Sequence, residues 1–355
     1  MGFSQEDESE KPEAAWENPV LVIVRGIKYN ESYKMLTGGI CMGSYLNPGN
    51  EAFAVALNSE IYVDKTGLLT YTNKVMNTLQ GYICNSRPRR FGKSITANML
   101  TAYYSKGCSS KEMFSGLEIS RAKDFEKHLN QYDVIHFDVQ WCMMDAGNAD
   151  QVVEYINHGI LQELKEKYGE LIPDTVKTAY GAMSYIKAAS GNKFVVIIDE
   201  WDVLIRDEAQ NHKVQEKYID FLRGMFKGSE PSKYIALAYL TGILPIKKLK
   251  TQSALNNFEE FTMLDAGRMA PYVGFTEEEV HDLCDRYGQI YEQVKLWYDG
   301  YRFENAGIYN PWSILNFVRS KELKAYWRDT SENYLINHVI KNAGEDLFDA
   351  LKELM

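Results

Sequence analysis

The chain has 355 residues, of which 45% are apolar and 25% are charged, and its formal net charge is −10. This composition is typical of a globular protein with two domains, or with one large domain and an appendage, and its acidic balance does not indicate a nucleic-acid or membrane surface. No apolar run is long enough for a membrane-spanning helix, and the N-terminus lacks the basic-then-apolar order of a signal peptide.

The cysteines point to a reducing compartment. The five of them are scattered along the chain without paired spacing, which argues against a zinc site or a disulfide framework. We therefore expect a cytoplasmic protein.

Residues 1–45 differ from the rest of the chain. Acidic residues crowd positions 6–17, where Lys11 is the only basic residue. Such a charge run is typical of a solvated, disordered extension. We therefore expect the folded core to begin near residue 46.

A short strand and a helix are expected next. Ile61–Thr66 begins with apolar residues and ends in a polar cap, and helical spacing runs from Gly67 to about Leu79. Because this segment directly precedes the loop described below, Asp64 is a candidate for one wall of a ligand pocket. The alternative is a plain connection between a strand and a helix.

A polar loop follows an apolar run that starts at Gly81 and that we expect to form a buried strand. The loop leads into Gly92-Lys93-Ser94, where a helical pattern begins that continues to Tyr104. Backbone N–H groups at the positive end of a helix can surround phosphates, Lys93 would bind the β- and γ-phosphates, and Ser94 would bind Mg²⁺. The expected nucleotide-binding residues of the loop are Arg87, Pro88, Arg89, Arg90, Phe91, Gly92, Lys93, Ser94 and Ile95.

The loop departs from the pattern G-x-x-x-x-G-K-[ST] at one position. The first glycine of that pattern would fall on Arg87. The alternative interpretation is a basic turn before a helix. Because Gly-Lys-Ser also arises by composition alone, the triplet needs a second motif to support it.

An acidic strand supplies this second motif. Lys193 precedes five apolar residues, and Asp199 and Glu200 follow them. Such a run is typical of a strand buried on both faces of a parallel sheet, and α/β sheets bind ligands at the carboxyl ends of their strands. We assign Asp199 to Mg²⁺, mainly through water, and Glu200 to activation of the attacking water. The alternative is a strand that ends in two solvated acids.

Other strands and helices alternate as in a parallel α/β sheet. His136 and Asp138 belong to a predicted strand and could line the site, although a hydrogen-bonded edge-strand histidine is the commoner outcome. Thr241, at the tip of another strand, is a candidate sensor of the γ-phosphate, and the alternative is a helix-capping threonine. The predicted strands are 134–139 and 234–240, and the predicted helices are 149–168, 175–189 and 218–226.

The pattern changes near residue 267 to helices without long strands between them. Thr276 and Glu279 have the spacing of a capping box at a helix start, and another helix is expected from Ser313 to Arg319. We therefore expect an α/β core at 46–266 with a mainly parallel sheet flanked by helices, and a helical lid subdomain at 267–355.

Together these motifs resemble the bacterial AAA-ATPase-like family of P-loop NTPases. The similarity covers about residues 45–330, and in that family Arg-Pro-Arg-Arg-Phe-Gly-Lys-Ser is itself the usual loop. The segments that carry the resemblance are Tyr62–Thr66, Ser86–Ser94, Ile198–Glu200, Thr241–Gly242, Gly274–Val280 and Trp297–Tyr301.

The resemblance implies a P-loop NTPase fold, ATP and Mg²⁺ as ligands, and a C-terminal helical lid. The family's functional positions are carried over to Lys93, Ser94, Asp199 and Glu200. Members often continue into a nuclease-like domain of the PD-(D/E)-x-K type. Because this chain ends at Met355 without such a segment, we do not expect nuclease activity.

Two functions from different classes fit these features. The first is a Mg²⁺-dependent ATPase in which hydrolysis is coupled to movement of the lid or of a partner. The second is a switch or scaffold that binds ATP, turns it over negligibly and recruits an effector. Glu200 favours the ATPase, because a pure binder needs no base there. A kinase is a weaker third option, because nothing in the sequence marks an acceptor pocket.

The expected partners are ATP and either a protein effector or a second copy of the chain. Activated ATPases place an arginine near the γ-phosphate, from the same subunit or a neighbouring one, and the sequence does not choose between the candidates. Three lysines near residue 250 could contact nucleic acid, but lysines on a turn are more often solvated, so nucleic acid is not indicated. The candidate arginines are Arg206, Arg223, Arg268 and Arg302, and the three lysines are Lys247, Lys248 and Lys250.

Overall fold

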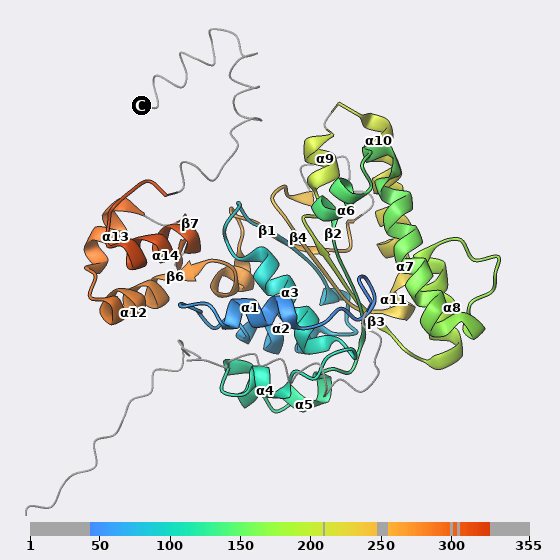
Figure 1. The fold of residues 1–355 in the computed structure, drawn as a ribbon, viewed down its shortest axis with the longest axis horizontal. Coiled ribbons are helices and arrows are strands. Elements are labelled where there is room, and N and C mark those ends of the chain that lie inside the picture. Colours follow the sequence, from blue (N-terminus) through green and yellow to red (C-terminus); the bar gives the residue numbers. More distant parts are fainter. Residues whose placement is uncertain (1–42, 209, 247–254, 299–300, 304–305, 327–355) are drawn as a thin grey trace, which may run out of the picture.

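A five-stranded parallel sheet forms the centre of the fold (Figure 1). The computed structural model describes residues 43–208, 210–246, 255–298, 301–303 and 306–326. The strands of the sheet are β1 (Tyr82–Ser86), β2 (Asp133–Asp138), β3 (Phe194–Asp199), β4 (Ile235–Gly242) and β5 (Glu259–Phe261). Their order is β2-β3-β4-β1-β5, and all neighbours are parallel. The first four confirm predicted strands, whereas β5 is too short and acidic to show an apolar pattern.

Helices cover both faces of this sheet. On one face lie α1 (Glu51–Leu57), α2 (Gly67–Val75), α3 (Lys93–Tyr104), α4 (Lys111–Phe114) and α5 (Phe125–His128). On the other lie α6 (Val139–Asp145), α7 (Val152–Tyr168), α8 (Ala179–Ser190), α9 (Val203–Asp207), α10 (His212–Phe226) and α11 (Pro231–Tyr234). Val195 and Ile197 of β3 face the first layer, and Val196 and Ile198 face the second. Burial on both faces explains why this strand is an unbroken apolar run.

The predicted helices around the sheet are confirmed, with changes at their ends. The helix expected from Gly67 to about Leu79 ends at Val75, and α10 begins before the predicted start. The short helices α6 and α9 were not predicted, because so few residues show no helical period. Short 3-10 turns complete the connections: η2 (Leu79–Gly81), η3 (Glu118–Arg121), η4 (Ala149–Gln151), η5 (Gly169–Leu171) and η8 (Gly267–Tyr272).

The strand predicted at Ile61–Thr66 is wrong. Within the described residues this segment is extended but joins no sheet. Its apolar side chains, Ile61 and Val63, instead pack into a cluster formed by the C-terminal part of the chain. The apolar residues that indicated a strand therefore contact the C-terminal part instead.

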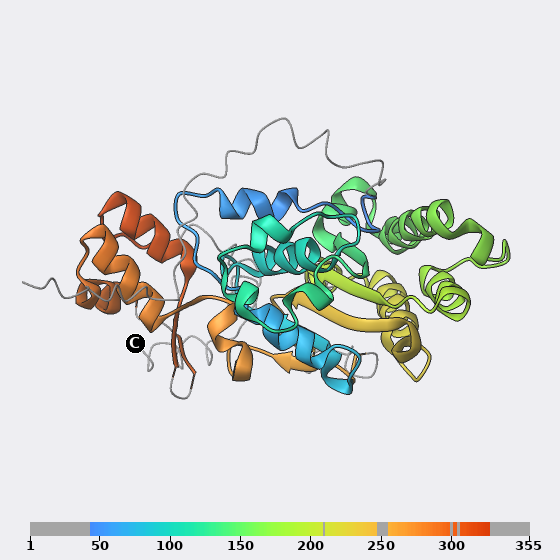
Figure 2. The ribbon, with the colours of Figure 1, turned by 90° about the horizontal axis from the view of Figure 1, so that it is seen from below.

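The C-terminal part combines helices with a small sheet. Its elements are β6 (Phe275–Thr276), α12 (Glu277–Tyr287), α13 (Tyr291–Trp297), β7 (Tyr301–Phe303), β8 (Ala306–Tyr309) and α14 (Pro311–Ser320). The antiparallel sheet, in the order β6-β8-β7, was not predicted, because each strand has only a few residues. The capping box of Thr276 and Glu279 is confirmed. Figures 1 and 2 place these helices at one end of the molecule and α7 and α8 at the other.

Lys65 ties the extended segment to the C-terminal part. Its ammonium contacts both carboxylate oxygens of Glu279 at 2.5 Å and donates to the carbonyl of Pro271 at 2.7 Å. Because Glu279 also accepts the backbone N–H of Thr276, one carboxylate joins the helix cap to the core. The domain boundary near residue 267 stays a prediction, and most of the expected extension at 1–45 lies outside the described residues.

Asp133, at the start of β2, joins three parts of the core. Its carboxylate is fully buried and accepts from Asn47 at 3.0 Å, Lys106 at 3.0 Å, Lys167 at 2.9 Å and Tyr168 at 2.8 Å. Burial alone would raise the pKa of Asp133, but the hydrogen bonds from Asn47 and Lys167 and the lysine charges lower it overall. A carboxyl group with a lowered folded-state pKa stabilises the fold at neutral pH.

We expect Asp133→Asn to lower the free energy of unfolding at pH 7 by about 3 kcal/mol, because two lysines lose their buried partner. The difference from the wild type should shrink as the pH falls below the usual range of an aspartate, where the wild-type carboxyl group also becomes protonated. Chemical denaturation measures both effects. Asp220→Asn, at an exposed pair on α10, is the control and should leave the midpoint unchanged. Equal effects of the two variants would contradict this role.

Candidate functional site

The carboxyl ends of four parallel strands meet at one edge of the sheet. In the β-ladder Asp138 is paired with Asp199, Ile198 with Leu240, and Ser86 with Gly242. The loop after β1 and the acidic tip of β3 therefore lie on the same side, separated by the end of β4. This edge is where α/β sheets bind ligands.

The loop after β1 turns sharply before α3 begins. Arg90 and Gly92 have positive φ angles of 70° and 87°, and Gly92 is the N-cap of α3. Glycine adopts such an angle without the cost that a Cβ imposes. The turn leaves the first residues of α3, Lys93 and Ser94, at the N-terminal end of a twelve-residue helix, where backbone N–H groups and the helix dipole favour an anion.

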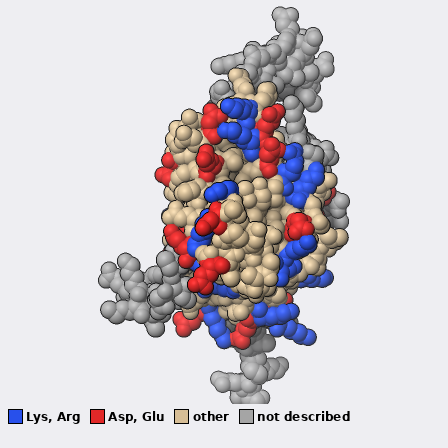
Figure 3. Space-filling model, turned by 90° about the vertical axis from the view of Figure 1, so that its right-hand side faces the viewer, with Lys and Arg blue, Asp and Glu red and all other residues tan. Residues whose placement is uncertain are grey.

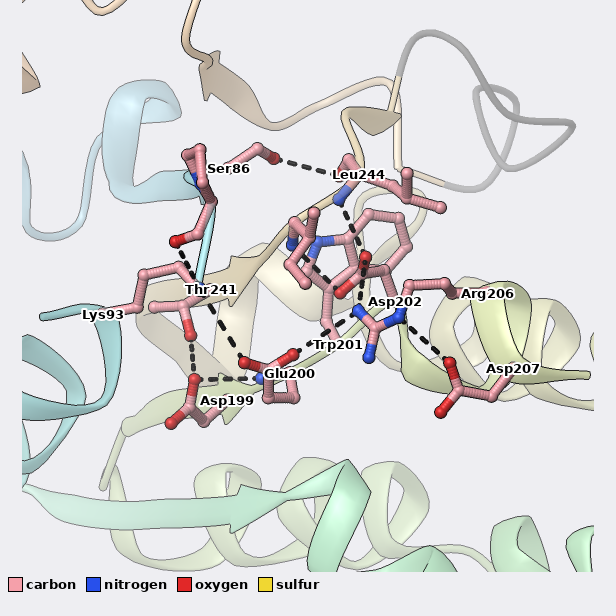
Figure 4. A network of polar contacts seen from close by, with 12 residues as sticks. Ser86, Lys93, Asp199, Glu200, Trp201, Asp202, Arg206, Asp207, Thr241 and Leu244 are labelled. Carbon is pink, nitrogen blue, oxygen red and sulfur yellow. Dashed lines mark hydrogen bonds and ion pairs between the residues drawn. The ribbon is translucent and has the colours of Figure 1, made fainter. Parts of the chain in front are cut away.

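Lys93 lies between the loop and the acidic strand tip. Only 5% of this residue is exposed; its Nζ donates to the carbonyl of Pro88 at 3.2 Å and lies 3.8 Å from Oε1 of Glu200 (Figure 4). Burial lowers the pKa of Lys93, while the negative charges of Glu200, Asp199 and Asp202 oppose this shift. The structure thus brings the loop motif and the acidic strand motif together at Lys93 and Glu200.

Asp199 is held by two hydrogen bonds at the tip of β3. It is 3% exposed and accepts the hydroxyl of Thr241 and, at 3.0 Å, the backbone N–H of Glu200. Glu200 itself has a φ angle of 51°, which is uncommon for a residue with a side chain. This turn directs the two successive carboxylates differently: Asp199 faces Thr241, and Glu200 faces Lys93 and Arg206 (Figure 4).

Ser94 and Asp199 border a common hollow, which we call the strand-end pocket. Asp138, His136 and Trp141 also line it. A hydroxyl and a carboxylate are the oxygen ligands that Mg²⁺ accepts when a nucleotide and water complete its shell. Burial raises the pKa of Asp138, and burial lowers that of His136 to about 4, so this histidine is neutral at pH 7. The Nδ1 of His136 forms a 2.9 Å hydrogen bond with the Thr101 hydroxyl.

Two further pockets meet at the loop. One, here the loop pocket, is lined by positively charged residues from the loop together with Glu200 and the first turn of α14. The other, here the apolar pocket, lies between the extended segment and α14. Both include Gly92, Ile95, Pro311 and Leu315, so they are neighbours. Other residues of the loop pocket are Arg89, Arg90, Lys93, Ser94, Arg206 and Trp312, and those of the apolar pocket include Tyr62, Val63, Phe91, Met99 and Phe275.

Several predicted ligand residues have internal partners instead. The Arg87 guanidinium is buried and donates to the carbonyls of Ser86 and Phe261, at 3.0 and 3.1 Å. Asp64 accepts the backbone N–H of Glu118 at 2.7 Å and two bonds from Thr66. Neither the Asp64 carboxylate nor the Arg87 guanidinium lines any of these three pockets. Both side chains instead stabilise the segments that form the pocket walls.

The other loop residues divide between the pockets and the core. Arg89, Arg90, Ser94 and Ile95 line the loop pocket, whereas Phe91 is buried in a small apolar cluster and also borders the apolar pocket. Pro88 contributes its carbonyl to Lys93. The side chain of Thr241 is buried against Asp199 and does not border the loop pocket.

Two residues near the site had no role assigned to them from the sequence. Asp202 is fully buried and accepts the backbone N–H groups of Ile243 and Leu244, at 3.2 and 2.8 Å, which fixes the chain after β4. Trp312, from α14, places its ring 4.2 Å from the Arg90 guanidinium carbon. Asp202 follows the acidic tip directly and could have been proposed on that ground, but no local pattern marks Trp312.

The four candidate arginines separate in space. Arg206 is 7% exposed within the site, Arg223 pairs with Asp220 on the surface of α10, and Arg268 lies over the ring of Tyr71. The side chain of Arg302 lies outside the described part of the structure. The structure therefore brings one of these arginines to Glu200.

Lys247, Lys248 and Lys250 lie outside the described residues. The face that includes α7, α8 and α10 carries basic side chains interspersed with acidic ones (Figure 3). None of the described helices combines the length and apolar character required to cross a bilayer.

Two comparisons relate the chain to known proteins. A family model described as "Predicted AAA-ATPase" matches residues 51–251, which include the loop and the acidic strand. The chain is also 26% identical over 282 residues to an "Uncharacterized protein in vnfD 5'region" from Azotobacter chroococcum mcd 1, and the match covers 76% of this chain and 50% of that protein. The chain thus spans half the length of this relative. On the strength of the family match across the loop and the strand tip, the chain belongs to the predicted AAA-ATPase family.

Proposed function

We propose that this protein binds ATP with Mg²⁺ and hydrolyses the bond between the β- and γ-phosphates. The observation that carries the proposal is the 3.8 Å approach of Lys93 to Glu200, next to a helix N-terminus and loop arginines. A phosphate-binding cation and a candidate base thus share one pocket. The family match supports ATP binding and hydrolysis in general, and the residue roles below are our proposal.

The triphosphate would occupy the loop pocket, where Arg89, Arg90 and Lys93 supply positive charge. The neighbouring apolar pocket suits the adenine ring of ATP, because its walls include the rings of Tyr62, Phe91 and Phe275. Apolar and aromatic walls with few polar groups are typical of small-ligand sites. Arg87 and Asp64 support the site through hydrogen bonds within the protein and would not contact the nucleotide.

Ser94 and Asp199 would hold Mg²⁺ at the strand-end pocket, with Asp199 acting mainly through water. Bound there, the ion would neutralise negative charge on the phosphate oxygens. Because the hydroxyl of Thr241 donates to Asp199, we propose that Thr241 orients this carboxylate rather than sensing the γ-phosphate directly. The ligand set suits Mg²⁺, which usually binds few protein oxygens beside nucleotide and water.

Glu200 would accept a proton from the attacking water. The water oxygen then forms a bond to the γ-phosphorus as the bond to the β-phosphate oxygen breaks, which gives ADP and inorganic phosphate. Lys93 lies close to Glu200 in this structure. Bound phosphates would attract the Lys93 ammonium away from Glu200, which would leave the Glu200 carboxylate free to accept a proton from water. Because Glu200 and the phosphates compete for Lys93, nucleotide binding would be a condition for the activation of Glu200.

Arg90 offers a route from the nucleotide to the C-terminal part. Its guanidinium lies over the ring of Trp312, and both residues line the loop pocket. A phosphate in this pocket would compete with the ring for Arg90, because an ion pair is stronger than most cation–π contacts. We propose that this exchange couples nucleotide binding to movement of α14 as part of the lid and thus to an effector.

We expect Lys93→Ala to weaken MgATP binding by at least about a hundredfold, because the phosphates lose a buried cation. Isothermal titration calorimetry with MgATP measures the affinity. Lys111→Ala, at an exposed pair with Glu126, is the matched control and should bind as the wild type does. Retained affinity in the Lys93 variant would contradict the assignment of the loop.

We expect Glu200→Gln to lower turnover by about a hundredfold or more while MgATP affinity changes by less than about twofold, because the amide accepts no proton from water. Phosphate release and calorimetry separate the two effects. Glu230→Gln, whose carboxylate pairs with Lys233 on the surface, controls for the isosteric change. A loss of affinity equal to that in Lys93→Ala would contradict separate roles.

The same measurement on the wild type distinguishes the two function classes. Phosphate release supports the ATPase. Tight MgATP binding without turnover in both the wild type and Glu200→Gln would instead support the switch that recruits an effector.

We expect MgADP or MgATP to change the fluorescence of Trp312, because Arg90 leaves the ring for the phosphates. The protein has six tryptophans, so the difference between the wild type and Trp312→Phe isolates this signal. Arg90→Ala should remove the nucleotide-dependent change, whereas Trp297→Phe, on α13, should preserve it. An unchanged response in Arg90→Ala would argue against the exchange.

A further inference from the structure

Arg206 is surrounded by carboxylates at the edge of the loop pocket. Its Nε donates to Asp207 at 3.0 Å, and its NH1 lies 3.2 Å from Asp202 and 3.6 Å from Oε2 of Glu200 (Figure 4). The side chain is 7% exposed. A guanidinium bonded along two sides has little freedom to rotate, since its planar fork is already oriented by its partners.

This guanidinium is anchored to the core independently of Glu200. Asp202 is fully buried and is itself held by the backbone N–H groups of Ile243 and Leu244. The anchor thus extends from α9 to the chain segment after β4. The position of Arg206 relative to Glu200 is therefore set by contacts with the core.

Glu200 has a different cation at each oxygen. Lys93 is 3.8 Å from Oε1, and Arg206 is 3.6 Å from Oε2. The two contacts differ in what a nucleotide does to them, because Lys93 begins helix α3 beside the phosphate-binding N–H groups, whereas Arg206 is held by Asp202 and Asp207. Phosphates would compete for Lys93 and leave the Arg206 contact in place.

We propose that Arg206 is the positioning residue for Glu200: its anchored guanidinium keeps the carboxylate at the loop pocket once Lys93 has turned to the phosphates. This role rests on the proposed ATPase function. Of the candidate arginines, this proposal assigns a role at the site to Arg206, which acts on Glu200 of the same chain. Arg206 acts through Glu200 and makes no contact with the γ-phosphate in this role.

Arg206→Gln tests the proposal, because MgATP affinity and kcat can be measured separately in this variant. We expect kcat to fall about tenfold to a hundredfold, the range typical when a residue that orients a functional group is lost. MgATP affinity should change by less than about twofold. Arg206→Lys should recover part of kcat, because it restores the charge without the fork. Arg223→Gln, the same change at an exposed pair on α10, is the matched control and should have no effect.

A double-mutant cycle with Glu200→Gln separates positioning from direct contact with the phosphate. If Arg206 acts through Glu200, single-turnover rates of the double variant and of Glu200→Gln should agree within about twofold, since the second change has nothing left to disturb. If Arg206 instead stabilised the γ-phosphate, its loss would multiply the defect of Glu200→Gln. That result would overturn the proposal.

Loss of Arg206 also removes a positively charged partner of the buried Asp202, which could destabilise the fold. The folding of each variant is therefore measured separately. Circular dichroism and thermal unfolding identify a variant that fails to fold. Asp207→Asn then serves as the second variant: its carboxylate is 37% exposed and holds Nε of Arg206, so its loss should lower kcat in the same direction with affinity preserved. Normal kcat in Asp207→Asn and Arg206→Lys together would overturn the proposal.

The outcomes also distinguish this role from the proposed function itself. Absence of phosphate release by the wild type would overturn the ATPase and the role of Arg206 with it. Turnover that requires Glu200 but is unaffected by Arg206→Gln would overturn the positioning role alone.

Discussion

The parallel register of β1, β4 and β3 is the constraint on which the rest of the site depends. It places the loop after Ser86 and the carboxylates after Ile198 at the same edge of the sheet, with the end of β4 between them. Only this arrangement lets Lys93 and Glu200, far apart in the sequence, approach within 3.8 Å. A slip of one residue would turn every side chain of these strands to the opposite face of the sheet.

Charge compensation explains why so many ionisable groups share this edge. Asp199, Glu200 and Asp202 follow one another closely, and burial of three carboxylates would be costly without partners. Thr241 and backbone N–H groups satisfy Asp199, while Lys93 and Arg206 face Glu200. These ionisable groups therefore have partners within the protein. A triphosphate would have to rearrange these pairs, which is a physical basis for coupling binding to conformational change.

The C-terminal part belongs to the site as much as the core does. Pro311 and Leu315 border both the loop pocket and the apolar pocket, and Trp312 contacts Arg90. The extended segment at 61–66 contributes to the same joint through Lys65 and its contact with Glu279. Residues from the segment at 61–66 and from α14 thus line neighbouring pockets at this joint.

The amino-acid sequence by itself determined the four longer strands of the sheet, its longer flanking helices and the two motifs at its edge. These follow from short-range patterns: unbroken apolar strands, a glycine before Lys93, and acids directly after a buried run. The tertiary structure decided which polar side chains face the pockets. Arg87 and Asp64 turn inward to carbonyls and N–H groups, whereas Arg206 and Trp312 reach the site. Local patterns do not encode these outcomes, because they depend on which distant backbone groups and carboxylates the packed elements bring within hydrogen-bonding distance.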